Sequence, residues 1–414
     1  MKVLIILPNL DLGGTEVVVM NYLRQFSIEF TARGKSSLFK TDACGVSESA
    51  SCDEPILFDF AVHGETGYFE EEARLLGAKI FRVPTRGESF FGNIRAMRRL
   101  YHENKYDFII VCTEHSFAFI EVAVAWFSGI KTRAVWSHFS GYQGKSRLKR
   151  HLHLIGRPFL RMFTNMFFAC TLDAGRWLFG NTFARNLQNK AAVPPLFSDR
   201  GELRSNDREF KKNFHIINNA IDLDKFAFNQ EVRDKIRYKI GLGDAFAVGI
   251  VGRLAAVKNH IFALESFAKI DLSKATFAKA DLTKTGFSKT EAVLIIIGDG
   301  EMRAQIEEMA ERLGISSRVF FTNAVENVHE YYQALDLLLM PSLHEGFGMV
   351  AIEAQASGLQ ALISDTVPQE VKVSELAFFK SLDDGADAWA TEISRFASEK
   401  WTRPLNPRFI SIGV

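Results

Sequence analysis

The chain's most informative chemistry is a pair of glutamates, Glu345 and Glu353, in the segment HEGFGMVAIE at residues 344–353. Two glycines lie between them, so we expect Glu345 in a loop and Glu353 on a helix that begins near Met349. Three backbone amides would then point out of that helix N-terminus: those of Phe347, Gly348 and Met349. Such an end suits a diphosphate, while one carboxylate can accept hydrogen bonds from sugar hydroxyls and the other from ribose hydroxyls. The alternative is that two surface glutamates flank a glycine turn.

A second candidate is a pair of cations, Arg253 and Lys258, in the segment VGRLAAVKNH at residues 251–260. They follow an apolar run that reads as a strand, and open α/β folds bind ligands where parallel strands end. An arginine can hold a diphosphate with two parallel hydrogen bonds, and a lysine can hold it as a point charge. A departing diphosphate gains charge, so the same contacts can also catalyse. The alternative is two solvated basic residues in a loop.

Two weaker candidates occur in the first half. Gly13 and Gly14 follow the first apolar run in LDLGGTE (residues 10–16), where a backbone without side chains lets a ligand approach closely. The segment is not a G-x-G-x-x-G fingerprint, so dinucleotide binding is not indicated. His138, at the end of an expected strand, can hydrogen-bond an acceptor or a sugar. A histidine beside Trp136 can equally be a structural residue.

The elements that position these residues repeat one pattern, a short apolar run followed by a turn and a helical stretch, which is typical of βα units on a parallel sheet. We expect strands at 3–8, 56–62, 78–84, 108–114, 133–139, 166–171, 214–218, 246–252, 292–298, 318–323, 336–342 and 359–365, the last run being the final strand. We expect helices at about 15–26, 68–76, 90–104, 117–127, 259–269, 301–314, 326–335 and 349–357. Each candidate group follows a strand, so all would lie at carboxyl edges of sheets, where clefts form.

Composition restricts the class of protein. The 414 residues are 47% hydrophobic and 24% charged, which predicts a soluble globular chain of about two domains. The formal net charge of +1 gives no reason to expect nucleic acid as a partner. Four separate cysteines suggest neither a zinc site nor a disulfide framework, and favour a reducing cytosol. The longest later apolar run is too short to span a bilayer, so we expect a soluble or peripheral protein.

Several segments depart from the pattern. Residues 31–52 read as a polar loop, 181–213 as a linker or insertion, and 271–290 as four pentapeptide-like repeats or an amphipathic insertion. The stretch 145–163 carries six Lys or Arg residues among apolar ones, and can lie on an anionic membrane or be a solvated helix face. We therefore predict an N-terminal domain at 1–180 and a C-terminal domain at 214–400.

The motifs, taken in order, resemble those of the retaining glycosyltransferases of family 4, which have the GT-B fold of two Rossmann-like domains with parallel sheets facing across a cleft. The matching phrases are GGTE, the strand-end SH, FHIINNAIDLDKF, VGRLAAVKNH, IIIGDGEMR and PSLHEGFGMVAIEAQASGL. The subgroup that the chain most resembles builds bacterial exopolysaccharides and capsules. The resemblance covers most of the chain outside the irregular segments and the last dozen residues.

This resemblance implies a role for each candidate. Glu345 would hold the donor sugar, Glu353 the ribose, and Arg253 and Lys258 the diphosphate. Gly14 would contact the donor phosphate, and His138 would stand near the acceptor. No cofactor or metal is implied, because the two cations take the role of the metal. The aspartates of Asp222-Leu223-Asp224 therefore read as structural. The family's C-terminal crossover helix has no counterpart after Lys400.

The predicted activity is therefore transfer of a hexose from a UDP- or GDP-sugar to a saccharide or lipid-linked acceptor, in the cytoplasm or on the inner face of the membrane. Two alternatives remain open. One is a non-catalytic GT-B protein that binds a sugar nucleotide or serves as a scaffold. The other is an epimerase or phosphorylase of the same fold, although no motif for a pyridoxal-phosphate lysine is present.

Overall fold

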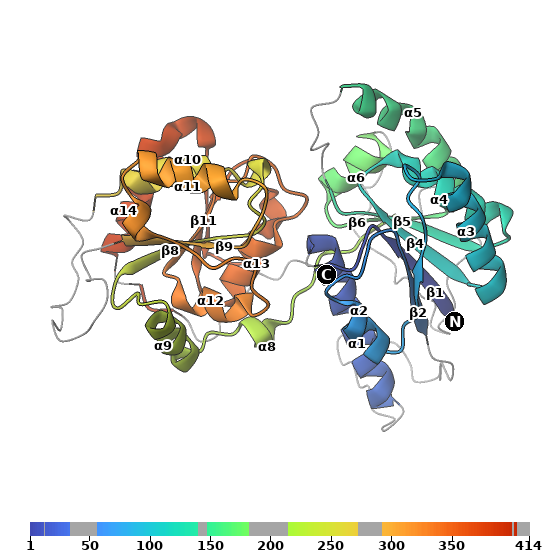
Figure 1. Ribbon diagram of the computed structural model, residues 1–414, viewed down its shortest axis with the longest axis horizontal. Helices are drawn as coiled ribbons and strands as arrows, with labels where there is room; N and C mark the ends of the chain where they lie inside the picture. Colours follow the sequence, from blue (N-terminus) through green and yellow to red (C-terminus); the bar gives the residue numbers. More distant parts are fainter. Residues whose placement is uncertain are drawn as a thin grey trace. The chain divides into compact units, whose positions relative to one another are not determined.

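The structure is a computed structural model that describes residues 1–11, 13–33, 56–139, 147–181, 214–271, 292–399 and 401–403. The chain forms two compact units, Met1–Ala220 and Ile221–Val414, and each is built around its own parallel sheet (Figure 1). The predicted α/β class is confirmed. Segments 31–52, 181–213 and 271–290 lie outside the described residues except at their ends, and so does most of the chain after Lys400.

The first sheet has seven strands in the order β3-β2-β1-β4-β5-β6-β7, with every neighbouring pair parallel. Its strands are β1 (Lys2–Leu7), β2 (Leu57–Val62), β3 (Ile80–Arg82), β4 (Phe108–Thr113), β5 (Thr132–Ser137), β6 (Met166–Ala169) and β7 (Phe214–Ile216). Helices cover both faces, which explains why central strands such as β1 are apolar along almost their whole length.

The helices of the first unit are α1 (Gly14–Arg33), α2 (Glu70–Leu75), α3 (Phe90–Asn104), α4 (Phe119–Phe127), α5 (Arg147–Phe163) and α6 (Leu172–Phe179). In Figure 1, α1 and α2 lie on one face of the sheet and α3 to α6 on the other. One prediction is wrong here. The run 214–218 was expected to open the second domain, but β7 pairs with β6 of the first sheet, and the boundary between units follows Ala220.

The second sheet has six parallel strands in the order β10-β9-β8-β11-β12-β13. They are β8 (Phe246–Val251), β9 (Ala292–Ile297), β10 (Val319–Phe321), β11 (Leu337–Met340), β12 (Gln360–Ser364) and β13 (Ala377–Lys380). The run 359–365 is therefore not the last strand, because β13 follows it at the edge of the sheet.

The helices of the second unit are α8 (Leu223–Phe226), α9 (Gln230–Lys239), α10 (His260–Ala268), α11 (Arg303–Arg312), α12 (Val328–Ala334), α13 (Met349–Ala356) and α14 (Gly385–Ser398). In Figure 1, α10, α11 and α14 lie on one face of the sheet, and α9, α12 and α13 on the other. Asp222 caps α8 by accepting a hydrogen bond from the Lys225 amide at 3.2 Å, which agrees with the structural role predicted for it.

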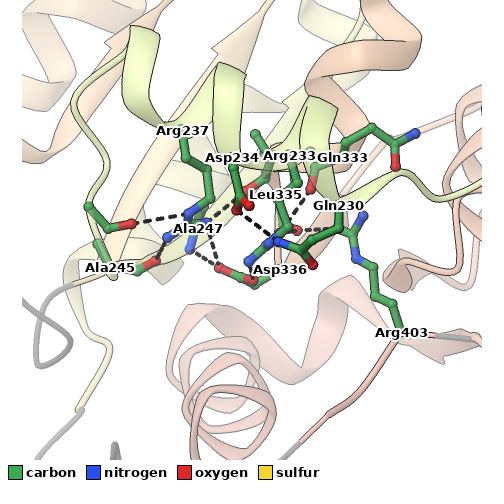
Figure 2. A network of polar contacts seen from close by, with 12 residues as sticks. Gln230, Arg233, Asp234, Arg237, Ala245, Ala247, Gln333, Leu335, Asp336 and Arg403 are labelled. Atoms are coloured by element: carbon green, nitrogen blue, oxygen red, sulfur yellow. Dashed lines mark hydrogen bonds and ion pairs between the residues drawn. The ribbon is translucent and has the colours of Figure 1, made fainter. Parts of the chain in front are cut away.

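A partly buried ionic network fixes α9 against the amino end of β11 (Figure 2). Asp336, directly before β11, accepts hydrogen bonds from Arg233 at 2.5 Å, from Arg237 at 3.2 Å and from the Ala247 amide at 2.8 Å. Burial alone would raise the pKa of Asp336, but the two guanidinium groups lower it overall, so the carboxylate stays ionised. The network lies at the opposite end of the strands from the candidate residues, and we assign it a structural role.

The strand orders place the candidate loops. In the second sheet the chain runs outward from β8 to β10 on one side and from β11 to β13 on the other, so the order reverses between β8 and β11. The first sheet reverses between β1 and β4 in the same way. Ligands of open α/β sheets bind outside the carboxyl ends of the strands at such switch points. The loops after β1, β8 and β11 carry most of the predicted candidates: Gly13, Arg253, Lys258, Glu345, Phe347 and Gly348.

Candidate functional site

The second unit brings Lys258 and Glu345 into direct contact. Lys258 ends a short turn of 3-10 helix (Ala256–Lys258) after β8, and Glu345 lies in the loop after β11. Because β8 and β11 are neighbours, the two loops meet, and the Lys258 Nζ donates to Glu345 Oε1 at 2.7 Å. Their side chains are only 20% and 12% exposed, so this is a partly buried ion pair at the switch point of the sheet.

Arg253 lies in the same loop but has a different partner. Its Nε donates to Glu301 Oε2 at 3.1 Å, and Glu301 follows β9, the other neighbour of β8. The two side chains are 75% and 57% exposed, so the pair is solvated and its net contribution to stability is about 0–1 kcal/mol. Each predicted cation therefore holds a carboxylate in this structure. Glu301 was not singled out in the sequence, because one acid after a glycine turn carries no distinctive spacing.

The turn into α13 depends on Gly348. This residue has φ +101°, a left-handed conformation that strains other residues, and a Cβ here would lie 3.2 Å from both Val367 and Val371. The helix begins at Met349 as predicted, and Gly348 offers no side chain to cap its first amides. Phe347 is buried just before the turn. Among the described residues no side chain caps the N-terminus of α13, which follows the loop that carries Glu345, and a helix end of this kind can bind an anion.

Glu353 lies on α13, as predicted, and is held by a residue that the sequence did not reveal. The Tyr332 hydroxyl, from α12, donates to Glu353 Oε2 at 2.8 Å. Burial raises the pKa of Glu353, and the hydrogen bond from Tyr332 offsets part of that rise. Tyr332 is fully buried, so it fixes the carboxylate. In the sequence, Tyr332 is one of two adjacent tyrosines on an expected helix, and the helical pattern gives no indication of the contact.

The two glycines of the first unit differ in their surroundings. A Cβ on Gly13 would lie 2.2 Å from Glu16 Oε2, whereas a Cβ on Gly14 would meet nothing within 4 Å. Gly14 is the first residue of α1, at the switch point between β1 and β4. Gly13 therefore makes room for the buried Glu16 side chain, and Gly14 leaves open space beside the backbone at the start of a helix.

His138 directly follows β5 and is buried against Trp136, with ring centroids 4.5 Å apart. Neither ring nitrogen has a hydrogen-bond partner among the described residues. Burial lowers the pKa of His138 to about 3, so the imidazole is neutral near pH 7. It can donate or accept a hydrogen bond, but it does not supply a positive charge. Within the first unit it lies one strand away from the switch point that carries Gly14.

The chain matches a known family over its second unit. Residues 232–401 match the family described as Glycosyl transferases group 1. The second unit is a group 1 glycosyl transferase domain. The match contains the Arg253–Lys258 loop, the Glu345 loop and α13. The predicted resemblance to glycosyltransferases is therefore confirmed for the domain that carries most of the candidate residues.

This glycosyltransferase is also similar to other named proteins. It is 29% identical over 406 residues to the Bacillus subtilis (strain 168) protein named "Putative glycosyltransferase EpsF", covering 96% of this chain and 88% of EpsF. It is 27% identical over 155 residues to the Escherichia coli UDP-Gal:alpha-D-GlcNAc-diphosphoundecaprenol alpha-1,3-galactosyltransferase, which is 36% of this chain and 35% of that enzyme.

Solved structures show the fold. The crystal structure of Anabaena Alr3699/HepE in complex with UDP and glucose superposes with a TM-score of 0.66 at 14% identity, covering 96% of this chain and 92% of that one. The predicted GT-B class, with two Rossmann-like units of seven and six parallel strands, is confirmed. The roles of the individual site residues stay predictions.

Proposed function

We propose that this glycosyltransferase is a retaining enzyme that moves a hexose from a UDP- or GDP-sugar to a saccharide or lipid-linked acceptor, in exopolysaccharide or capsule synthesis. The observation that carries the proposal is the Lys258–Glu345 pair in the loops that lead to α10 and to the N-terminus of α13. A cation, a carboxylate and helix amides that no described side chain caps, all at one switch point, are the groups that a sugar diphosphate requires.

The structure suggests how a donor would exchange with these contacts. Lys258 and Arg253 each hold a carboxylate, so a diphosphate would replace Glu345 and Glu301 as their partners. Glu345, released from Lys258, is then available to accept hydrogen bonds from the donor sugar. Glu353, held by Tyr332, can accept hydrogen bonds from the ribose. The amides at Phe347, Gly348 and Met349 would stabilise the diphosphate from the helix end.

The cations also fit the expected chemistry. Charge builds up on the departing diphosphate as the bond to the sugar breaks, and Lys258 and Arg253 stabilise that charge more strongly than the charge of the bound donor. Retention would follow from attack on the same face of the sugar, assisted by the departing phosphate. In this proposal no metal is needed. In the first unit, Gly13, Gly14 and His138 stay our candidates for the remaining donor and acceptor contacts.

Related proteins support a UDP-sugar and a lipid-linked acceptor as the first choices to test. HepE was crystallised with UDP and glucose, and the Escherichia coli enzyme is named for UDP-galactose and a diphosphoundecaprenol acceptor. A polysaccharide role follows from the resemblance of the motifs to the exopolysaccharide and capsule subgroup. We propose a cytoplasmic location, with the acceptor at the inner face of the membrane.

The test is donor binding and slow donor hydrolysis with a panel of UDP- and GDP-sugars, with EDTA present. Wild type is compared with Glu345→Ala and Lys258→Ala. Lys372→Ala is the matched control, because Lys372 forms a solvated pair with Glu375 at 3.5 Å in the same unit. We expect one donor to release free sugar, both site variants to lose this activity, and the control to keep it.

Other outcomes would overturn the proposal. Tight nucleotide binding without turnover, even with membrane extracts as acceptor, would favour a non-catalytic sugar-nucleotide-binding protein. A requirement for a divalent cation would contradict the metal-independent mechanism. Hydrolysis that survives in both site variants would place the donor elsewhere on the protein.

A further inference from the structure

Helix α5 carries an exposed apolar stripe on one side. Its members are spaced by four, three, four and three residues, so they share one helix face. We call this set the α5 stripe: Leu148, Leu152, Ile155, Phe159 and Met162. Their side chains are between 39% and 69% exposed. Five large apolar residues in a single exposed row are unusual for a helix of a globular domain, which normally turns such a row toward the core.

A different face of α5, about a third of a turn from the stripe, packs on the rest of the first unit, so the stripe is not a misplaced part of the core. His153, Gly156 and Leu160 are buried on that face. His153 Nδ1 accepts a hydrogen bond from the Ser116 amide at 2.9 Å, and a Cβ on Gly156 would lie 2.4 Å from Ser116 Oγ. These close contacts fix the rotation of α5, and the fixed rotation keeps the stripe on the outside.

The end of α4 extends the apolar surface. Trp126 and Phe127 are 49% and 77% exposed, and their rings lie 5.6 and 6.3 Å from the ring of Phe163 at the end of α5. The Phe119 ring lies 5.5 Å from the Phe159 ring of the stripe, which ties the two helices together. Tryptophan beside exposed phenylalanine is typical of surfaces that enter the interfacial layer of a membrane.

The charge of this region selects the partner. Residues 145–163 contain six Lys or Arg and no Asp or Glu, although the whole chain has a net charge of only +1. Arg150 and His151 are exposed on the same helix; His151 borders the stripe, and Arg150 lies about half a turn around the helix from it. A second copy of the chain would bring an equally cationic face against this one, which disfavours a dimer through it. An anionic surface with an apolar layer beneath matches both the charge and the stripe.

We propose that the α4–α5 face docks on an anionic phospholipid surface, with α5 lying in the plane of the membrane. The stripe and the Trp126–Phe127 end would enter the boundary between headgroups and acyl chains, and the basic side chains would contact the phosphates. Among the described residues no helix is long and apolar enough to cross a bilayer. The inference concerns a surface of the first unit and does not require turnover, so it stands or falls separately from the proposed donor site.

The test is co-sedimentation of the full chain with phosphatidylcholine vesicles, with and without phosphatidylglycerol. Ile155→Asp places a charge in the middle of the stripe. Leu75→Asp is the matched control, because Leu75 is an 81% exposed leucine on α2 of the same unit. Both changes are at the surface, so thermal melts should be unchanged. A second variant, Arg150→Glu, tests the electrostatic contribution.

We expect wild type and Leu75→Asp to bind only the vesicles that contain phosphatidylglycerol, and to be released by salt. Ile155→Asp should lower the bound fraction roughly tenfold, and Arg150→Glu should lower it by a smaller factor. Absence of wild-type binding to anionic vesicles would overturn the proposal. So would equal binding by Ile155→Asp and wild type, or a dimer that Ile155→Asp dissociates in the absence of lipid.

Discussion

At the residue scale, Glu345 pairs with Lys258 in this structure and would bind the donor sugar in the proposed complex. The pair is partly buried, so its attraction is less screened than that of the exposed Arg253–Glu301 pair. If Lys258 binds the diphosphate as proposed, the diphosphate competes with Glu345 for it. Glu345 would then weaken binding of the nucleotide alone and would favour binding only when a sugar is present.

This argument predicts opposite effects of one substitution on two ligands. Glu345→Gln should bind UDP about two- to tenfold more tightly than wild type, because Lys258 is released, which corresponds to about 0.4–1.4 kcal/mol. The same variant should lose sugar transfer, because it no longer supplies a carboxylate to the donor sugar. Titration calorimetry with UDP and with the active UDP-sugar measures both. Glu375→Gln is the control, and weaker UDP binding by Glu345→Gln would refute the competition.

At the element scale, the turn that opens α13 determines whether the helix amides are available. Gly348→Ala should destabilise the second unit by about 2–3 kcal/mol, from the left-handed φ and from the crowding against Val367 and Val371. It should also weaken UDP binding, because relief of the strain rotates the first amides of α13. The melting temperature and the UDP dissociation constant are the two readouts.

Gly314→Ala is the matched control for this prediction. Gly314 also has a positive φ, +68°, but a Cβ there would meet nothing within 4 Å, and it lies beyond α11, away from the candidate loops. It should cost about 1–2 kcal/mol of stability and leave UDP binding unchanged. If both variants bind UDP as wild type does, the N-terminus of α13 is not a phosphate site.

The properties of single helices and strands also explain which of them could be predicted from the sequence. Strands buried on both faces, such as AVLIII in β9, stand out because they are continuously apolar. The strand β7 was assigned to the wrong sheet, because its membership is decided by pairing with β6 and not by its own three residues. The charged helix α9 was missed, since its arginines serve the Asp336 network and leave little apolar periodicity. The edge strand β13 was also missed: only Ala377 of its four residues is fully buried, so the strand needs no long apolar run.

The residues of the candidate site could also be predicted from the sequence only in part. The sequence supplied Lys258 and Glu345 as separate loop residues, because each follows an apolar strand with glycines or cations at a recognisable spacing. Their contact could not be predicted from periodicity, since it arises from the pairing of β8 with β11 across 87 positions of the chain. Tyr332 illustrates the same limit, because its contact with Glu353 depends on where the fold places its hydroxyl and not on its residue type.

At the scale of the whole molecule, both units bury neutral histidines, and this makes stability depend on pH. Burial lowers the pKa of His138 to about 3 and those of His153 and His260 to about 4. An unfolded chain binds these protons near pH 6.5, so between about pH 6.5 and pH 4 it holds more protons than the folded chain. The stability that the folded chain gains from keeping these histidines neutral is complete above about pH 6.5 and is lost as pH falls toward 4.

This linkage predicts that each buried histidine removes about 2 kcal/mol from the free energy of unfolding between about pH 7 and pH 5. Because His138 and His153 lie in the first unit and His260 in the second, the calorimetric transitions of both units should move to lower temperature.

Neither ring nitrogen of His260 has a partner among the described residues, so His260→Leu removes the titration without breaking a hydrogen bond there. It should lower the number of protons that the second unit takes up on unfolding by up to about one, and so flatten the pH dependence of its unfolding free energy. His102→Leu is the control, since His102 is exposed in the folded chain as it is in the unfolded one. A second unit that keeps its full pH dependence in His260→Leu would show that other groups drive its loss of stability in acid.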